Sequence, residues 1–328
     1  MAEDIKAKAF ESVFDLVGIT DAAPIDNEQY TLLADWLAFG YAGRMSYMHQ
    51  NLDKRINPAK LLENAESVIS VGLNYTPPPD RGRKDEKRGT RDETGHLPSS
   101  RPMGRVANYA RYEDYHVFIK KGLSKLVDFI SSAAGTDYEF KICVDSVPLA
   151  ERALAARAGL GFIGKNHMLI NPTLGPQIFL GEIITSLKLQ TDEPIADSCR
   201  SCNKCIEACP TGALRTDGQF DANKCISYLT IEHKGQKRGD LAEKTGVRLF
   251  GCDECVLACP YQENAPVCKN KQFKYYNDRY RLDLYRILNL TEADFDAEFA
   301  DSPIKRLGLE ALRRNAQICL VNATSREV

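Results

Sequence analysis

Four cysteines and a proline with a characteristic spacing are the strongest chemical signal in this sequence. Cys199, Cys202, Cys205 and Cys209 are followed at once by Pro210, which gives the run C-x2-C-x2-C-x3-C-P. This spacing is typical of bacterial-type ferredoxins, in which the first three thiolates bind one 4Fe–4S cubane and the fourth binds a neighbouring cubane. The run therefore predicts two iron–sulfur clusters and the transfer of single electrons.

A second, partial set of cysteines lies downstream. Cys252, Cys255 and Cys259 precede Pro260, and Cys225 is a separate candidate ligand. The ferredoxin crossover assigns Cys199, Cys202, Cys205 and Cys259 to the first cluster, and Cys209, Cys225, Cys252 and Cys255 to the second. Because the two motifs exchange ligands, the crossover predicts one compact module with the two cubanes close together.

Two other uses of these cysteines fit less well. A disulfide framework needs an oxidising compartment and usually a short secreted chain, whereas this sequence has 328 residues and an acidic start in place of an apolar leader. Zinc ribbons use C-x2-C pairs, but not this full run ending in proline. The remaining cysteines, Cys143, Cys268 and Cys319, are expected to be free thiols that pack as small apolar residues.

The composition is that of a soluble protein with a sizeable core. Hydrophobic residues make up 43% and charged residues 27% of the sequence, and the net charge is −2. No apolar run approaches the roughly 20 residues that span a bilayer. Together with the reduced thiolates, this predicts a cytoplasmic protein without a membrane span.

The elements that must position the cysteines alternate between helices and strands. Apolar periodicity predicts helices within residues 1–66, with Leu16 and Val17 in the first of them, and a long polar loop from Pro77 to about Val106. Further helices are expected at Asp114–Ala134 and Pro148–Ala158, strands at Ser67–Tyr75, Tyr138–Val144 and Gln177–Ile184, and more helix after Tyr280. This order predicts an α/β (α+β) core of about 190 residues before the cysteine module.

A glycine-rich segment resembles a nucleotide-binding loop without meeting its requirements. Gly159, Gly161 and Gly164 match G-x-G-x-x-G, and Lys165 follows them. Phosphate binding needs a strand before the glycines and a helix after them, but here a helix is expected to precede them. The glycines instead indicate a tight turn or a close approach of the backbone to a flat ligand.

Six segments in order resemble the epoxyqueuosine reductase family. They are GYAGRMSYM (40–48), ANYARYEDYHVFIKKGLSKL (107–126), VDSVPLAERALAARAGLGFIGKN (144–166), CRSCNKCIEACPTGAL (199–214), KCISYLTIEHKG (224–235) and GCDECVLACP (251–260). The resemblance implies a cobalamin in the core beside two 4Fe–4S clusters. It further implies the reduction of epoxyqueuosine to queuosine at the wobble position of a tRNA.

The resemblance also implies roles for single residues. Asp145 matches the family's proton donor, and burial against the corrin is expected to raise its pKa so that it stays protonated. Arg55, Leu169, Leu180, Ser227, Asp253 and Asp145 itself match positions that contact the cobalamin. His116 is not expected to ligate cobalt, because Asp114-Tyr-His116 lacks the glycine of the D-x-H-x-x-G signature.

The expected organisation has three parts. Residues 1–190 form the cobalamin-binding core, 191–268 the ferredoxin-like module, and 269–328 a short helical segment without the helical-repeat domain of many family members. Lys234, Lys237, Arg238 and the basic run at 81–91 are candidate contacts to tRNA phosphates. The bases at 81–91 fit a solvated loop equally well.

Two other functions fit part of this pattern. A cytosolic reductive dehalogenase-like enzyme would have the same corrinoid and iron–sulfur cofactors, and a plain electron carrier would have the clusters alone. The segment CISYLTIE (225–232) and the size of the core favour the tRNA-modifying reductase. Its partners would be tRNA carrying epoxyqueuosine and an external one-electron donor of the flavodoxin or ferredoxin type, and the protein is expected to act as a monomer.

Overall fold

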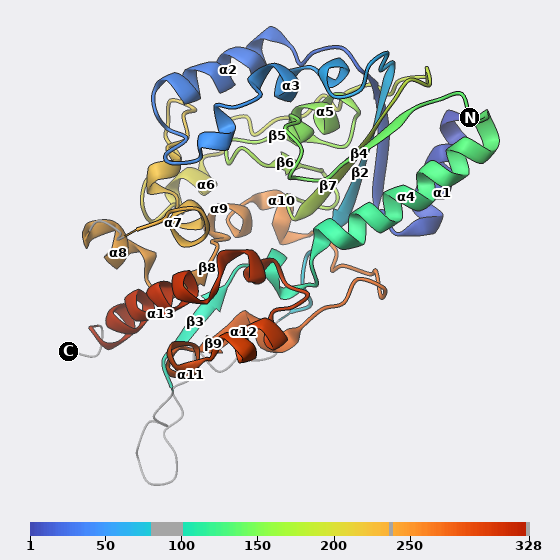
Figure 1. The fold of residues 1–328 in the computed structure, drawn as a ribbon. Helices are drawn as coiled ribbons and strands as arrows, with labels where there is room; N and C mark the ends of the chain where they lie inside the picture. Colours follow the sequence, from blue (N-terminus) through green and yellow to red (C-terminus); the bar gives the residue numbers. More distant parts are fainter. Residues whose placement is uncertain (80–100, 236–238, 326–328) are drawn as a thin grey trace.

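The computed structural model describes residues 1–79, 101–235 and 239–325 (Figure 1). Its largest sheet has the strand order β1-β2-β7-β4, and every neighbouring pair is antiparallel. The strands are β1 (Leu16–Asp21), β2 (Ser67–Asn74), β4 (Phe140–Cys143) and β7 (Ile178–Thr185). The central strand β2 is buried at all eight residues, which explains its continuous run of apolar and small side chains.

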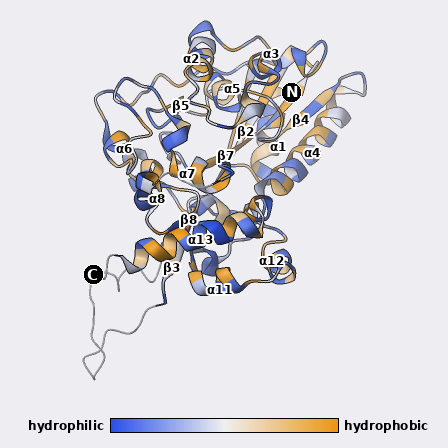
Figure 2. Ribbon diagram, turned by 60° about the vertical axis from the view of Figure 1, so that its left-hand side comes forward, coloured by the Kyte–Doolittle hydropathy of each residue, from blue (hydrophilic) through white to orange (hydrophobic). Residues whose placement is uncertain are grey.

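Helices cover both faces of this sheet. Figure 1 shows α1 (Ala2–Ser12) and α4 (Tyr115–Ala134) along one face and α5 (Glu151–Arg157) on the other, with α2 (Asn27–Ala38) and α3 (Leu52–Ile56) beyond α5. Side chains alternate along the strands, so Ile69 and Ile183 pack under α4 while Val68 and Ile184 pack under α5. Helix α4 is amphipathic, with hydrophobic and hydrophilic residues along its length (Figure 2).

The cysteine module consists of short helices joined by turns. They are α6 (Lys204–Glu207), α7 (Ile226–Ile231), α8 (Gly239–Thr245), α9 (Glu254–Leu257) and α10 (Pro260–Glu263). A two-stranded hairpin of the core, β5 (Phe162–Ile163) and β6 (Leu169–Ile170), lies against it through Phe162, Ile170 and Cys259. The hairpin therefore connects the main sheet to the cysteines.

A second sheet joins distant parts of the chain. Its order is β8-β3-β9, formed by β8 (Arg248–Phe250), β3 (Met103–Val106) and β9 (Arg281–Asp283). Helices α11 (Leu284–Asn289), α12 (Glu292–Glu298) and α13 (Leu309–Thr324) close over it and bury Phe250, Phe295 and Phe299. Because β3, β8 and β9 come from the three expected parts of the chain, those parts share one hydrophobic core.

Most expected elements are present, with two corrections. Leu16 and Val17 were expected in a helix, but α1 ends at Ser12 and both residues pair with β2 as part of β1. The end of the expected polar loop contains β3, which forms because β8 and β9 each offer it a free edge. In the described part of the chain, no helix is long and apolar enough to cross a bilayer.

Candidate functional site

Asp145 lies at the carboxyl end of β4, in a turn with an unusual backbone. Its φ is +53°, in the left-handed region that aspartate tolerates better than most residues. The turn is tight, because the Ser146 nitrogen donates to the Val144 oxygen at 2.5 Å. This conformation turns the Asp145 side chain away from the sheet, and the side chain is 46% exposed.

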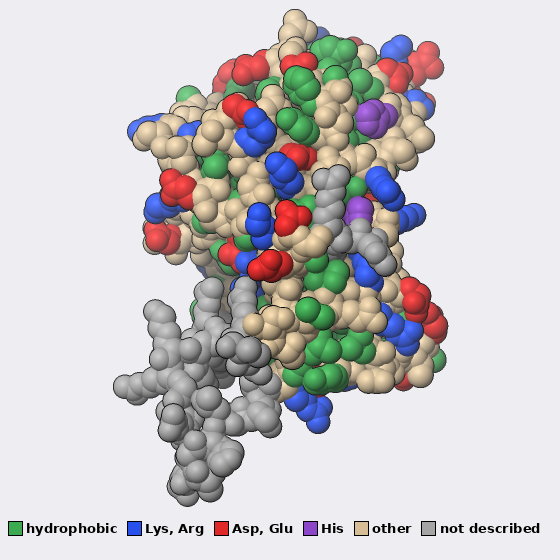
Figure 3. All heavy atoms as spheres, turned by 90° about the vertical axis from the view of Figure 1, so that its left-hand side faces the viewer, with side chains coloured by type: hydrophobic (Ala, Val, Ile, Leu, Met, Phe, Trp, Pro, Cys, Tyr) green, Lys and Arg blue, Asp and Glu red, His purple; other side chains and the backbone are tan. Residues whose placement is uncertain are grey.

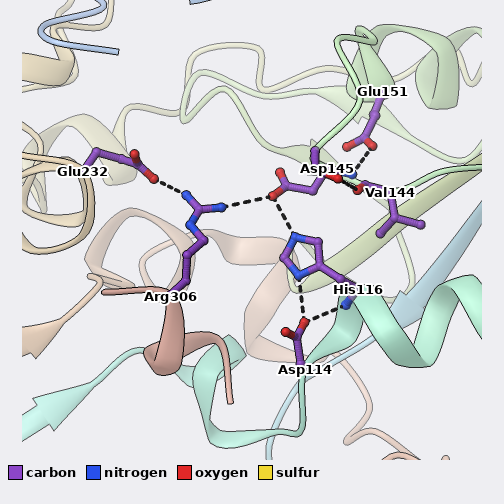
Figure 4. Close-up of polar contacts among 8 residues, drawn as sticks. Asp114, His116, Val144, Asp145, Glu151, Glu232 and Arg306 are labelled. Atoms are coloured by element: carbon purple, nitrogen blue, oxygen red, sulfur yellow. Dashed lines mark hydrogen bonds and ion pairs between the residues drawn. The ribbon is translucent and has the colours of Figure 1, made fainter. Parts of the chain in front are cut away.

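A histidine from another element holds the Asp145 carboxylate. His116 Nε2 lies 3.0 Å from Asp145 Oδ2, and His116 Nδ1 lies 2.7 Å from Asp114 Oδ1 (Figure 4). Asp114 also caps α4 by accepting from the His116 nitrogen at 2.9 Å. Tyr115 stacks on the imidazole, with ring centroids 4.1 Å apart. The start of α4 thus fixes the histidine between two carboxylates.

An arginine from the C-terminal segment completes the arrangement. Arg306 Nη1 lies 3.9 Å from Asp145 Oδ2, and its other nitrogen pairs with Glu232 beyond the end of α7 (Figure 4). Asp145, Glu232 and Arg306 come from the core, the cysteine module and the last part of the chain. The candidate site is therefore formed where these three parts meet.

The charges at this site act on the pKa of Asp145 in the direction opposite to the effect expected from burial against a corrin. The hydrogen bond from His116 lowers the pKa of Asp145 and outweighs burial, and the Arg306 charge adds to the effect. Burial alone would lower the pKa of His116, but hydrogen bonds to Asp114 and Asp145 raise it to about 9. At neutral pH the structure thus holds an ionised Asp145 beside a protonated His116.

The eight expected cluster cysteines fall into two groups of four. Cys199, Cys202, Cys205 and Cys259 line a cavity of ≈ 360 Å³ together with Ile170 and Tyr261. Burial and the nearby thiols of Cys225, Cys252 and Cys209 raise the pKa of Cys255 well above its ordinary value. The structure thus brings together the two sets that the ferredoxin crossover predicts.

The cavity is large for a single metal ion. Zinc binds thiolates at about 2.3 Å, and among the described residues no three His, Cys, Asp or Glu side chains converge closely enough to hold one ion. Four thiols around an open space suit a cubane, which each thiolate reaches through a different iron. Of the other cysteines, Cys143 and Cys319 are fully buried, as expected, and Cys268 is partly buried.

Lys165, which follows the glycine-rich segment, binds the first cysteine loop. Its Nζ donates to the carbonyl oxygens of Arg200 and Cys202 at 3.0 and 2.9 Å, and its backbone nitrogen lies 3.4 Å from Cys199 Sγ. At Gly161 a Cβ would meet the Ile170 oxygen at 2.3 Å, so this glycine permits the close approach of β5 and β6. The segment therefore positions the cysteine module.

The residues expected to contact a cobalamin lie in different environments. Arg55 lies in the last turn of α3, and its Nε is buried without a hydrogen-bond partner in the described residues. Leu169 and Leu180 pack together beside Leu160. Asp253 accepts from the Asn108 nitrogen at 2.7 Å, and burial raises its pKa to about 6. Ser227 lies in α7, where its carbonyl oxygen accepts from Thr230.

The candidate phosphate contacts are only partly described. Lys234 is exposed, and its carbonyl oxygen accepts from Arg44 at 3.1 Å. The basic run at 81–91, Lys237 and Arg238 lie outside the described residues. On the face that carries α7 and α8, basic and acidic side chains are interspersed (Figure 3).

Sequence reasoning missed three polar residues of the site. His116 was considered only as a metal ligand, although its place two residues after the helix cap Asp114 is a local signal that the imidazole is fixed. Glu232 and Arg306 lie 74 residues apart in the sequence, and no local pattern indicates that they pair.

The chain is similar to proteins of one family along nearly its whole length. A family model described as "Epoxyqueuosine reductase QueG, DUF1730" matches residues 55–146, and one described as "4Fe-4S double cluster binding domain" matches residues 198–262. The epoxyqueuosine reductase of Xanthomonas campestris pv. campestris is 38% identical, with 99% of this chain and 88% of the relative covered. That of Leadbetterella byssophila is 37% identical, with 96% of each chain covered.

Solved structures agree with this similarity. The epoxyqueuosine reductase of Streptococcus thermophilus superimposes with a TM-score of 0.84 and 29% identity, over 99% of this chain and 82% of that one. A Bacillus subtilis structure, with its catalytic loop swung out of the active site, has a TM-score of 0.86 and 30% identity over the same shares. The double-cluster module and the mixed helix and sheet core are confirmed, and the chain belongs to the epoxyqueuosine reductase family of oxidoreductases.

Proposed function

We propose that this protein reduces epoxyqueuosine to queuosine at the wobble position of a tRNA. The observation that carries the proposal is a fixed acid pair, Asp145 and His116, in the same fold as two groups of four cysteines. One related structure is of an epoxyqueuosine reductase with an epoxyqueuosine-modified tRNA stem loop. The reaction takes up two electrons and two protons, replaces the epoxide by an alkene and releases the oxygen as water.

The cysteines would hold the electron-carrying groups. Cys199, Cys202, Cys205 and Cys259 would bind one 4Fe–4S cluster, and Cys209, Cys225, Cys252 and Cys255 the other. Lys165 keeps the first loop against the core. We propose that an external donor of the flavodoxin or ferredoxin type reduces the clusters, and that the protein acts as a cytoplasmic monomer.

The residues near Asp145 suit a cobalamin. The buried Arg55 Nε has no partner in the described residues, so it can donate to an amide or phosphate oxygen of the corrin side chains. Leu169 and Leu180 would offer apolar contacts, and Ser227 and Asp253 would contact the corrin from the cysteine module. When bound, cobalamin supplies a reduced cobalt centre able to attack or reduce the strained epoxide ring.

The acid pair would deliver the proton that the departing oxygen needs. His116 carries the proton on Nε2 and faces Asp145 Oδ2 at 3.0 Å. As negative charge develops on the oxygen, the His116 proton moves from Nε2 to the Asp145 carboxylate, and Asp145 in turn protonates the oxygen. Asp114, on the other side of the imidazole, stabilises the positive charge until that moment. Asp145 is thus the catalytic residue, and His116 is its proton store.

Turnover is expected to fall as the pH rises through about 9. The pKa of His116 in the folded protein is raised from 6.5 to about 9, so the charged pair is present at neutral pH and is lost as the pH rises through about 9. The rate of single-turnover conversion by pre-reduced protein, followed from about pH 6 to about pH 10, measures this alkaline fall in activity. His116→Gln should remove the fall of the rate with rising pH. The same fall in that variant would assign the titration to another group.

Binding of tRNA is expected to be electrostatic and local. Acidic and basic side chains are mixed on the face that carries α7 and α8 (Figure 3), so we expect a few bases, and not the net charge, to contact the phosphates. Neutralising Lys234, Lys237 and Arg238 should weaken binding and lower the log–log salt slope by up to about 0.7–0.9 per lost contact. Lys125→Gln, on the exposed side of α4, is the matched control. An unchanged slope in the triple variant would place the tRNA elsewhere.

Conversion of the proposed substrate tests the function directly. Purified protein reconstituted with iron, sulfide and cobalamin is incubated with a chemical reductant and tRNA bearing epoxyqueuosine. Nucleoside mass spectrometry should then show queuosine. Dehalogenation of a haloaromatic compound in place of this conversion would indicate the dehalogenase-like function, and iron–sulfur absorbance without corrin uptake would indicate a plain electron carrier.

A further inference from the structure

A buried glutamate, Glu182, and a half-buried one, Glu151, lie behind the Asp145 turn. Glu182 belongs to β7 and pairs in register with Cys143 of β4, two residues before Asp145. It is fully buried, and neither carboxyl oxygen receives a hydrogen bond from a conventional donor among the described residues. Its carboxyl group instead faces that of Glu151, the first residue of α5.

Two facing carboxyl groups at such a place must share a proton. Burial raises the pKa of Glu182 well above its ordinary value, and the neighbouring Glu151 raises it further. Burial likewise raises the pKa of Glu151. A charge on the fully buried Glu182 would be repelled by the Glu151 carboxylate and would have no water around it, so one of the two groups is protonated and donates to the other. The proton belongs on Glu182, because it is the more deeply buried and has no other partner to stabilise a charge.

The Glu151 carboxyl group also accepts a hydrogen bond from the backbone of Asp145. The Asp145 nitrogen donates to Glu151 Oε1 at 2.5 Å, and Figure 4 shows Glu151 reaching this backbone while His116 reaches the side chain. The Asp145 turn has a left-handed conformation, which is less favourable than the common regions for an L-residue, so hydrogen bonds from its surroundings help to hold it. A carboxylate acceptor gives a stronger hydrogen bond than a neutral one.

We propose that Glu151, which accepts from the Asp145 nitrogen, is a positioning residue that fixes the Asp145 turn in its catalytic place. The proposal deepens the proposed function, on which its catalytic part rests. Glu151 touches the backbone of the acid and not the reacting oxygen, so its contribution is geometric. A displacement of about 1 Å at a catalytic group can lower turnover by about 10²-fold.

Hydrogen exchange of the turn, measured by mass spectrometry, tests the positioning role without substrate. In Glu151→Ala the peptide covering residues 144–150 should exchange at least about tenfold faster than in the wild type, because the hydrogen bond from the Asp145 nitrogen to Glu151 is lost. Turnover should fall by roughly 10–10²-fold through kcat, with KM for the tRNA unchanged. Glu139→Ala, an exposed glutamate just before β4, is the matched control and should change neither quantity.

Two further variants distinguish the loss of the hydrogen bond to the Asp145 nitrogen from a general loss of structure. Glu182→Gln keeps a donor toward Glu151 without needing a proton, so the turn should stay protected. Glu151→Asp keeps the charge but withdraws it from the Asp145 nitrogen, so the turn should exchange fast even if the alanine variant fails to fold. Slow exchange in both Glu151 variants, or fast exchange in Glu182→Gln, would overturn the proposal. Failure of the wild type to convert the tRNA would defeat the proposed function and leave the exchange result standing.

Discussion

Asp145→Asn is expected to lower turnover by roughly 10²–10⁴-fold, the usual contribution of a positioned general acid. Asparagine keeps the shape and can still bond to His116 Nε2, which lies 3.0 Å from the carboxylate. It cannot pass a proton from the imidazole to the departing oxygen. The same change removes one of the two carboxylates that raise the pKa of His116, so a smaller fraction of His116 should be protonated.

The measurement for this variant is single-turnover formation of queuosine by protein loaded with its cofactors. Corrin content, iron content and tRNA affinity should match those of the wild type, because the Asp145 side chain is an exposed end of a strand turn and not part of the core. Asp137→Asn, an exposed aspartate before β4, is the control for the chemical change itself. Activity within a few-fold of the wild type would assign the proton to water or another residue. Loss of the corrin from the Asp145→Asn variant would make Asp145 a structural ligand instead.

The cysteine module could be predicted from the sequence because its information is local. Spacings of two and three residues between thiols decide which of them face one cluster, and short helices such as α6 and α9 follow from those turns. The long buried strands were also predictable, since β2 and β7 are runs of β-branched and apolar residues.

The second sheet and the acid pair could not be predicted in the same way. Strand β3 is four residues long and forms only because β8 and β9, more than 140 residues later, provide its partners. The charge of Asp145 depends on His116, 29 residues earlier, and on Arg306 from the end of the chain. Burial against a corrin is expected to raise the pKa of Asp145, but the lowering by His116 and Arg306 has no signal in the sequence around Asp145.

Cys202→Ser is expected to remove one of the two clusters and to abolish turnover. Cys202 lines the ≈ 360 Å³ cavity with Cys199, Cys205 and Cys259, so its loss leaves three thiolates for the four ligand positions of a cubane. Serine is a poor ligand at neutral pH, because its hydroxyl stays protonated. Iron should fall from about eight to about four per chain.

The loss should spread to the structure around the cavity. The Cys202 oxygen accepts from Lys165 Nζ at 2.9 Å, and the neighbouring Arg200 oxygen accepts from the same ammonium, so the loop and the core hairpin are held together at this point. Without the cluster, hydrogen bonds such as these are left to hold the loop, and heating should release the module before the main sheet unfolds. Cys268→Ala, whose thiol lies outside both groups, is the matched control for removing a sulfur atom.

Iron analysis, electron paramagnetic resonance of the reduced protein and turnover together decide the outcome. The second cluster should keep its own signal in Cys202→Ser, because Cys209, Cys225, Cys252 and Cys255 form a separate group. Without the first cluster, electrons cannot pass from one cluster to the other. Product should therefore not form, even though tRNA still binds. About eight irons in the variant, or stoichiometric zinc in the wild type, would contradict the two-cluster assignment.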